Sequence, residues 1–500
     1  MVAIGRFGRS YRSTGAAKAS TIRRALIVVL AAGPPAVACS AAVAEPTDRS
    51  IILSREGFTL RWHLQAGINV VVEENLFWNF AQTVAPAAGF DSDPRWLEVY
   101  AKPGIGFEQA LGDATTLYGK LSAVASYTGG IDAYDTGNTG RITLEEGYIG
   151  LRHAPAAPGF GFDLSVGPRE LKLGTGMLIA NGGTSGFERG ALKLGPRKAW
   201  EMAAIGRLTH AGVTATGFYI DPNELTSSDG ENRLAGADLR YDPAGGGYAG
   251  LTYLQVLNSE SPYVRAAPGG LGPPAILPGA REGTSAVNLY ARTAPFEGVL
   301  ENWFFAGDVA HQWNDDVDLR AWAGRVQAGY TFAALPWSPS LVYSYQTFSG
   351  DDPGTARLER FDPLYYEGSP SAWATGSKSS MVFINSNVQA HGLALRLQPS
   401  PRDTLTFRYA HIRANELRSP IQFGQATRVD TTGGAANVVS GVTDAHLSDD
   451  FFLEYSRILN PNTYLTAGVS VGVPGAGIRN VAGGRADVWS GGFVNLVVNF

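Results

Sequence analysis

Basic side chains with apolar neighbours recur along this 500-residue chain, as in Leu395-Arg396-Leu397 and Phe407-Arg408-Tyr409. Successive side chains of a β-strand point to opposite faces, so the basic residues and their apolar neighbours are expected on different faces. A guanidinium group binds a carboxylate through two parallel hydrogen bonds, so a wall of such groups would hold an anion and pass it along. The basic residues expected on this polar face are Arg61, Lys102, Lys120, Arg152, Arg169, Arg240, Arg292, Arg325, Arg396 and Arg408.

Acidic residues are expected on the same face, and they leave the role of each cation open. Ladders of arginine and acid can simply keep a wide polar interior shaped and hydrated, without any ligand. For a single arginine, structural pairing and ligand contact are therefore both open. The acids in question are Glu98, Glu146, Asp163, Asp238 and Glu454.

Eighteen stretches of the chain have period-two patterning or strong strand composition, which predicts the elements that must carry these side chains. An even number of strands returns both ends of a barrel to one side. Glycine makes up 62 of the 500 residues, and tyrosine and tryptophan are plentiful, as short strands and aromatic girdles require. The stretches span about 59–72, 95–107, 115–128, 142–153, 160–167, 198–208, 212–220, 233–242, 248–258, 284–294, 299–313, 318–332, 340–348, 386–398, 404–414, 449–458, 463–473 and 487–500.

The connections between these stretches alternate between short and long. The short ones are rich in Pro, Gly, Asn and Asp, as in Pro461-Asn462, and the long ones include 73–94, 129–141, 168–197 and 349–385. The connection 314–317 is the one short exception in the long set. Short periplasmic turns and long outer loops are typical of bacterial outer-membrane barrels.

The last stretch ends on Phe500, with Val494, Leu496 and Val498 on the same face. A chain that ends inside a strand needs a neighbour for that strand, and a closed barrel supplies one. We therefore predict an all-β fold, an 18-stranded antiparallel transmembrane β-barrel in the bacterial outer membrane. A secreted β-sandwich or β-helix is the alternative, but it would not explain the parity of the loops.

Residues 1–44 resemble an export signal, which leaves residues 45–500 for the barrel. Residues 1–24 carry six basic residues and no acid, and the apolar run 25–38 is too short to cross a membrane as a helix. Small residues suitable for cleavage precede Glu45. Two alternatives are a lipoprotein anchored through Cys39, the only cysteine, and a twin-arginine signal at Arg23-Arg24.

Other functional classes find little support in the sequence. Nucleic-acid binding is not supported, because nothing in the sequence resembles a basic stripe. Gly245–Gly250 matches a nucleotide-binding pattern, but no helix follows it. The seven histidines are scattered and predict no metal site, and we expect no cofactor, although Asp91 with Asp93 and Asp351 with Asp352 could hold calcium in outer loops.

Several stretches resemble the alginate export family of outer-membrane porins. Residues 163–174 are similar to a family strand that ends in Gly-Arg-Gln-Glu-Leu and a following glycine. Gly350-Asp-Asp352 with Phe361-Asp-Pro-Leu364 resembles its loop signature, and 452–456 with 465–474 resembles its penultimate hairpin. The likeness runs from about residue 140 to the C-terminus. It implies an 18-stranded barrel that passes an anionic polysaccharide outward, whereas composition implies only a barrel.

Two departures from the family pattern limit what can be carried over. Pro168 stands where the family has an arginine, so the role of that arginine is not transferred, although Arg169 lies beside it. Some relatives close the pore with a long periplasmic turn, but residues 460–462 form a minimal one. Any restriction of the pore is therefore expected from outer loops or from side chains in the lumen.

Three functions remain open from the sequence. A channel for an anionic, alginate-like polysaccharide would be anion-selective and would work with periplasmic export-complex proteins. A general or substrate-uptake porin would pass small anionic solutes without such partners. An enzyme or adhesin would need a nucleophile with a histidine partner or very large loops, and neither is evident, so no catalytic residue is expected. Either transport function places a monomer among outer-membrane lipids.

Overall fold

The computed structural model describes residue 48 and residues 50–79, 89–155, 159–293, 298–368, 372–376, 383–421, 429–430, 437–438 and 441–500. The chain divides into Met1–Arg49 and Ser50–Phe500, and every strand described belongs to the second unit. The expected signal peptide, 1–44, lies outside the described residues. Within the described ranges, no helix combines the length and the apolar character needed to cross a membrane.

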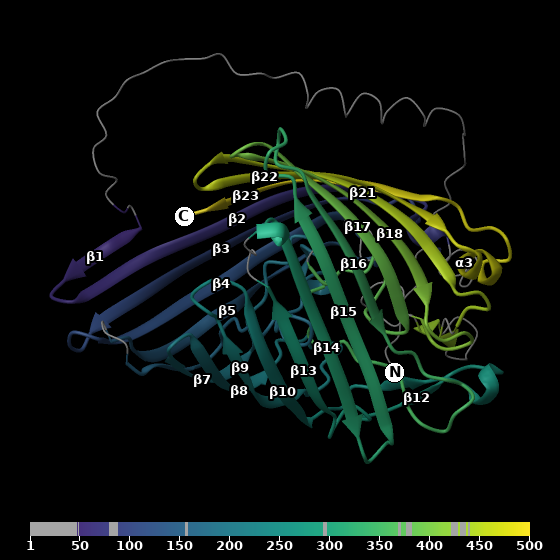
Figure 1. Cartoon of the computed structure of the whole chain (residues 1–500), viewed down its shortest axis with the longest axis horizontal. Coiled ribbons are helices and arrows are strands. Elements are labelled where there is room, and N and C mark those ends of the chain that lie inside the picture. The colour runs from purple at the N-terminus through teal and green to yellow at the C-terminus, as the bar shows by residue number, and fades with distance from the viewer. Residues whose placement is uncertain are drawn as a thin grey trace. The chain divides into compact units, whose positions relative to one another are not determined.

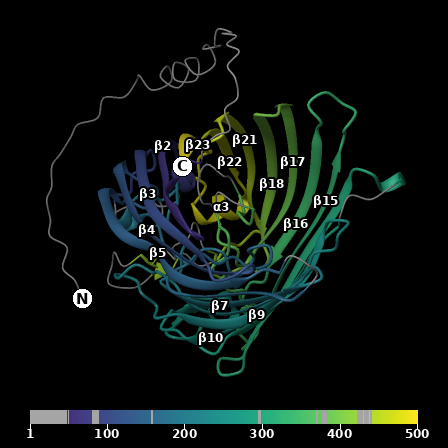
Figure 2. The same cartoon turned by 90° about the vertical axis from the view of Figure 1, so that its left-hand side faces the viewer.

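The barrel wall is built from long antiparallel strands that wrap around a common axis (Figures 1 and 2). Its strands are β2 (Phe58–Glu74), β3 (Arg95–Ala110), β4 (Thr115–Ile131), β5 (Gly137–His153), β6 (Gly161–Val166), β7 (Met202–His210), β8 (Val213–Asp221), β9 (Arg233–Tyr241), β10 (Tyr248–Asn258), β13 (Ser285–Arg292), β14 (Trp303–Asn314), β15 (Leu319–Thr331), β16 (Ser340–Phe348), β17 (Val388–Ser400), β18 (Asp403–Ala414), β21 (His446–Asn460), β22 (Thr463–Pro474) and β23 (Trp489–Asn499).

Short elements accompany the wall. Besides α3 (Ala476–Val481), they are the strands β1 (Ile51–Arg55), β11 (Tyr263–Arg265), β12 (Ala275–Leu277), β19 (Val429–Asp430) and β20 (Asn437–Val438), and the single-turn helices η1 (Leu76–Asn79), η3 (Phe187–Arg189), η4 (Pro268–Gly270) and η5 (Gly298–Leu300).

Pairing of the first wall strand with the last closes the sheet. β2 pairs with β3 along one edge and with β23 along the other, from Gln65 opposite Asn499 to Glu74 opposite Ser490. The sheet holds 19 strands, and β1 is an extra one that pairs only with the first residues of β2. The prediction of a closed 18-stranded antiparallel barrel is therefore confirmed. Closure satisfies the backbone groups of every wall strand internally, as a lipid environment demands.

The two faces of the wall differ sharply in side-chain type. Leu239, Leu251, Leu289 and Val309 are direct neighbours on successive strands, and each is at least 40% exposed. The positions just before or after them carry a second row, which is buried inside the barrel: Asp238, Thr252, Asn288 and Ala310. Apolar side chains thus face outward and polar or small ones inward, as in outer-membrane barrels.

The predicted parity of the connections is confirmed. Short turns join β3 to β4, β7 to β8 and β21 to β22 at one end of the barrel, and the long connections lie at the other end. One loop is much shorter than expected, since β4 and β5 extend further and leave only 132–136 between them. By analogy with bacterial barrels, the short turns mark the periplasmic end.

The C-terminal residue is part of the closing seam, the pairing of β2 with β23. The Phe500 amide donates to the Leu64 carbonyl at 2.7 Å, and the Leu64 amide donates to the Phe500 carbonyl at 2.9 Å. The Phe500 ring also stacks on Trp62, with centroids 6.1 Å apart. Both aromatic side chains lie on the outward face at the short-turn end.

We expect deletion of Phe500 to lower the yield of folded barrel while leaving the conductance of inserted molecules unchanged. The deletion removes two backbone hydrogen bonds and one ring pair from the seam, whereas the lumen keeps its side chains. Heat-modifiable migration on a gel measures the folded fraction. Phe160→Ala, an exposed aromatic far from the seam, is the matched control, and equal folding of both variants would contradict this role for Phe500.

Candidate functional site

The candidate site is the inward face of the wall together with the segments folded against it. All nine predicted basic residues in strands lie on the face opposite the exposed apolar side chains, and Arg169 follows β6 directly. Lys102, Arg325 and Arg408 lie near the middle of their strands. The residues close to the short-turn ends of their strands are Arg61, Lys120, Arg152, Arg240, Arg292 and Arg396.

Two lysines and three acids form one cluster, in which β3 to β5 supply all members except Glu170, which follows β6. Lys102 Nζ lies 2.8 Å from Glu170 and 3.2 Å from Glu145, and Lys120 Nζ lies 2.6 Å from Glu146. Glu145 shares the inward side with Glu146 because a bulge in β5 places two residues opposite one of β4. A polar cavity of about 410 Å³ opens beside the cluster and is lined by, among others, His63, Gln65, Tyr100, Ser122 and Lys198.

A second cluster surrounds Tyr118. Its hydroxyl donates to Asp163 and accepts from Arg169 Nη1 at 2.9 Å. The Arg169 guanidinium also lies over the Tyr148 ring, 4.6 Å from its centroid. Arg152 pairs with Glu108 at 3.1 Å, and more than two fifths of each side chain is exposed. Exposed pairs of this kind contribute little to stability, so the Arg152 guanidinium stays accessible from the lumen.

The other predicted cations differ in how firmly they are held. Arg240 pairs with Asp242 at 2.7 Å, and the Arg292 guanidinium lies 3.9 Å from the centroid of the Phe304 ring. Arg325 is buried, 3.7 Å from Asp308 on the neighbouring strand. Arg396 and Arg408 form no ion pair with any residue in the described ranges. Arg292 has no ion pair there either, and Glu454 attracts the charge of Arg408 electrostatically.

A long segment, residues 167–201 between β6 and β7, crosses the lumen; we call it the crossing segment. At one end, Glu98 on β3 accepts the backbone amides of Lys193 and Leu194 at 2.8–3.1 Å. Glu145 on β5 accepts those of Lys198 and Ala199 at 2.8 and 3.1 Å. These carboxylates therefore hold backbone donors of the segment rather than serving only as partners for cations.

Arg197 fixes the same end of the crossing segment. It is only 2% exposed, and it donates to Thr143 Oγ1 at 2.7 Å and to Ser126 Oγ at 2.8 Å. It also donates to the backbone carbonyl of Arg141 at 3.0 Å. An arginine with this many partners acts as a structural clamp, since its donors are already used.

The far end of the crossing segment reaches the opposite wall. Thr175 donates to Asp308 on β14, and the sulfur of Met177 accepts from Asn288 on β13 at 3.4 Å. Leu171, Met177 and Ile179 are fully buried there. The segment thus spans from β3–β5 to β13–β14 through the interior.

The described residues of 349–387, which we call the second infolded segment, pack on the crossing segment. Trp373 is fully buried and donates from Nε1 to the Thr175 carbonyl at 3.0 Å. The Arg325 guanidinium lies 3.5 Å from the centroid of its ring. Ile179 and Tyr365 form a parallel bridge that joins the two segments. The described parts of the two segments therefore occupy space inside the barrel, and residues 194–196 and 198 of the crossing segment line the polar cavity beside Lys102.

Both segments were predicted as outer loops, from which a restriction of the pore was expected, and the structure places their described residues inside the barrel. The physical reason is their apolar content, which needs burial, together with inward acids that accept their amides. Arg197 was missed because it lies in a predicted loop. Arg207, which faces Asp163 across β6 and β7, was missed because β7 carries apolar residues on both faces.

The acid pairs considered for calcium are used by the loops themselves. Asp351 is buried and accepts the amides of Ala266 at 2.6 Å and Glu359 at 2.8 Å. Asp91 accepts the amide of Asp93, which in turn accepts that of Asn75. Their geometry is that of loop-stabilising turns.

Loosening the crossing segment should widen the path. In Glu98→Ala, the buried amides of Lys193 and Leu194 lose their acceptor, at about 1–3 kcal/mol for each donor left unsatisfied. We expect higher and noisier single-channel conductance in planar bilayers. Glu74→Ala is the control, because Glu74 is exposed and lies at the end of β2 that neighbours the Glu98 end of β3. Unchanged conductance in Glu98→Ala would show that the segment does not restrict flow.

A buried carboxyl in the 132–136 loop should make stability depend on pH. Burial raises the pKa of Asp132 to about 6 from an ordinary 3.8. The folded state then holds an extra proton between these values, so stability is lost as pH rises from about 4 to above 6. We expect the stability of Asp132→Asn relative to wild type to increase by on the order of 2 kcal/mol as pH rises from 4 to 7. Urea unfolding at pH 4 and pH 7 measures the free energy of unfolding of each protein. Asp113 is exposed, so the stability of Asp113→Asn relative to wild type should not change between these pH values.

Comparison with known proteins gives one matching family and several solved structures with partial similarity. Residues 284–488 match the family described as alginate export. Among solved structures, OpdO of Pseudomonas aeruginosa is 11% identical, with 88% of this chain and 97% of that one covered and a TM-score of 0.46. OccK7 (OpdD) of the same organism is 10% identical, with 89% and 98% covered and a TM-score of 0.45. OmpF of Salmonella typhi, in complex with daunomycin, is 10% identical, with 89% and 98% covered and a TM-score of 0.38. No curated protein matches.

Proposed function

We propose that this outer-membrane β-barrel, whose residues 284–488 match the alginate export family, is a channel that passes an anionic, alginate-like polysaccharide outward. The observation that carries the proposal is the set of inward cations near the short-turn end. That end faces the periplasm in bacterial barrels, so a polyanion leaving the periplasm meets these cations first. The ten basic residues of the sequence analysis are proposed as its pore-lining contacts.

The cations supply attraction without tight capture. Arg396 and Arg408 lack an acid within ion-pair distance among the described residues. Arg152 and Arg240 each pair with an acid that is itself partly exposed to the lumen. Conduction needs sites that bind well enough to admit a ligand and weakly enough to release it. Partly compensated guanidinium groups fit that requirement, because a polymer carboxylate can replace an internal acid and then move on.

The infolded segments supply the restriction. A chain of sugar rings is narrow compared with an 18-stranded lumen, and an unrestricted pore of that width would leak small solutes. The crossing segment and the second infolded segment reduce the open cross-section of the lumen. Inward carboxylates hold the crossing segment in place through its backbone amides. No long periplasmic turn is needed for this purpose.

A substrate-uptake porin for small anionic solutes is the second candidate. It is favoured by the number of inward cations that already pair with acids, as Lys102 and Lys120 do with three glutamates. Such compensation weakens the pull on a polymer and suits a polar path for small molecules. In either function the chain works in outer-membrane lipid as a monomer after removal of residues 1–44, and export would add periplasmic export-complex proteins as partners.

Ion selectivity with polymer block tests the proposal. Reconstituted protein in a KCl gradient should prefer chloride to potassium, and oligouronates should interrupt the current. Arg396→Gln with Arg408→Gln should lower the chloride preference at least about twofold, since a nearby unit charge is worth about 1 kcal/mol even in water. The block should weaken in parallel.

Arg320→Gln serves as the matched control because Arg320 lies on the outward face and pairs with Asp315. It removes one cation without changing the lumen. Chloride preference without any block by oligouronates would leave only the uptake porin. A cation-selective pore that ignores both the polymer and the double substitution would reject export.

A further inference from the structure

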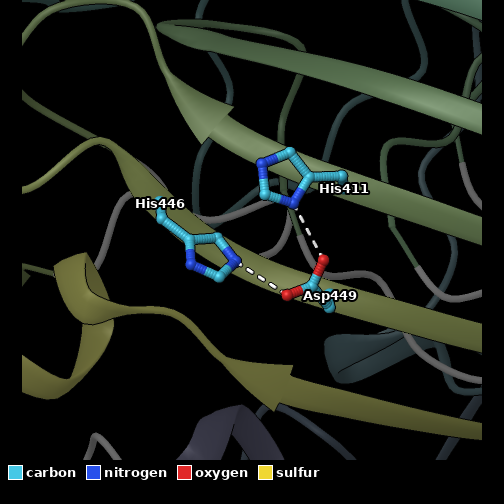
Figure 3. Close-up of side chains that lie close together, drawn as sticks. All are labelled: His411, His446 and Asp449. Carbon is cyan, nitrogen blue, oxygen red and sulfur yellow. Dashed lines mark hydrogen bonds and ion pairs between the residues drawn. The ribbon is translucent and has the colours of Figure 1, made fainter.

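Two histidines and one aspartate meet on the outward face of the barrel, away from the lumen. His411 lies on β18, and His446 and Asp449 lie on β21, the neighbouring strand (Figure 3). Asp449 alternates with the buried Asp450 and shares its face with the exposed Phe451. All three side chains are close to the ends of their strands that lead into the long connection 415–445.

The three side chains converge on one point. His411 Nδ1 lies 2.8 Å from Asp449 Oδ1, and His446 Nε2 lies 2.9 Å from Asp449 Oδ2. Each histidine thus faces a different oxygen of the same carboxylate, as the close-up shows (Figure 3). The possible ligand atoms all lie within 4.8 Å of one another. A tetrahedral zinc ion with bonds of about 2.0–2.2 Å sets its ligand atoms roughly 3.4 Å apart, which falls inside the observed spread.

One nitrogen of the cluster, His446 Nε2, has no hydrogen-bond partner in the described structure. It is buried from solvent, and its closeness to Asp449 does not give hydrogen-bond geometry. A buried nitrogen of this kind normally finds a partner. A metal ion between the imidazole and the carboxylate would supply it. The three side chains as a whole are 25–30% exposed, so the cluster lies at the barrel surface.

We propose that His411, His446 and Asp449 form a three-ligand site for a transition-metal ion of the zinc class. Imidazole with carboxylate suits zinc, nickel or copper(II), whereas calcium prefers sites made of oxygen alone. The Tyr409 hydroxyl, 2.8 Å from Asp449 Oδ1, would orient the carboxylate from outside. Three protein ligands leave a fourth position for water.

The position of the site suggests what binding would do. His446 is the first residue of β21, where the chain re-enters the wall after 415–445. An ion shared with His411 would fasten this re-entry point to β18. Tyr343, Tyr345 and Tyr409 lie on the same outward region, and tyrosines of this kind mark the level of the membrane–water interface, where aqueous ions are available. The inference is independent of what the lumen conducts.

Calorimetric titration of the detergent-solubilised full chain with zinc chloride, after treatment with a chelator, tests the site. We expect one equivalent to bind, and the thermal unfolding midpoint to rise with zinc and not with calcium. His446→Ala should weaken binding by roughly 10- to 100-fold or more, since even changes to outer-shell partners of metal sites reach that range. Asp449→Asn should do the same.

His391→Ala is the matched control. His391 faces His411 directly across β17 and β18, but its Nδ1 is engaged with the Tyr343 hydroxyl at 2.8 Å, so zinc affinity should stay unchanged. Heat-modifiable migration confirms that each variant is folded, and His446→Gln replaces any variant that is not. Absence of zinc binding to the wild type, or equal affinity in the wild type and folded His446 variants, would overturn the proposal.

Discussion

Closure of the sheet is the constraint on which the rest of this structure depends. Inside a bilayer, a strand edge cannot find water for its amides and carbonyls, so every wall strand needs two neighbours. The last strand meets the first from Gln65 opposite Asn499 onward, and Phe500 continues the pairing to the final residue. Once the ring is closed, side-chain alternation divides the protein into an apolar exterior and a polar interior. All chemistry of the lumen follows from that division.

The interior does not stay an empty cylinder. Inward carboxylates such as Glu98 and Glu145 accept backbone amides of the crossing segment, and the second infolded segment packs on it through Trp373. Charged residues of the inward face therefore differ in role between the two ends of the barrel. Near the long connections, acids and arginines bind protein segments. Near the short turns, cations such as Arg396 have no acid within ion-pair distance among the described residues.

Much of the architecture could be predicted from the sequence because it rests on local patterns. Period-two alternation located every wall strand, and turn residues such as Pro461 and Asn462 located the short connections. The infolding of 167–201 could not be predicted, since no local pattern tells a loop in the lumen from one in solvent. Ion pairs such as Lys102 with Glu170 depend on segments 68 residues apart. The meeting of His411 with Asp449 likewise depends on register between strands separated by a long loop.

The most direct test compares the rate at which a polyanion blocks the channel from its two sides. Single channels inserted in known orientation can be exposed to an oligouronate on one side and then on the other, and the rate of block measured at equal voltage magnitude. We expect faster block from the short-turn side, where the accessible cations lie, and slower block from the side of the long connections. Equal rates from both sides, or faster block from the side of the long connections, would contradict this expectation.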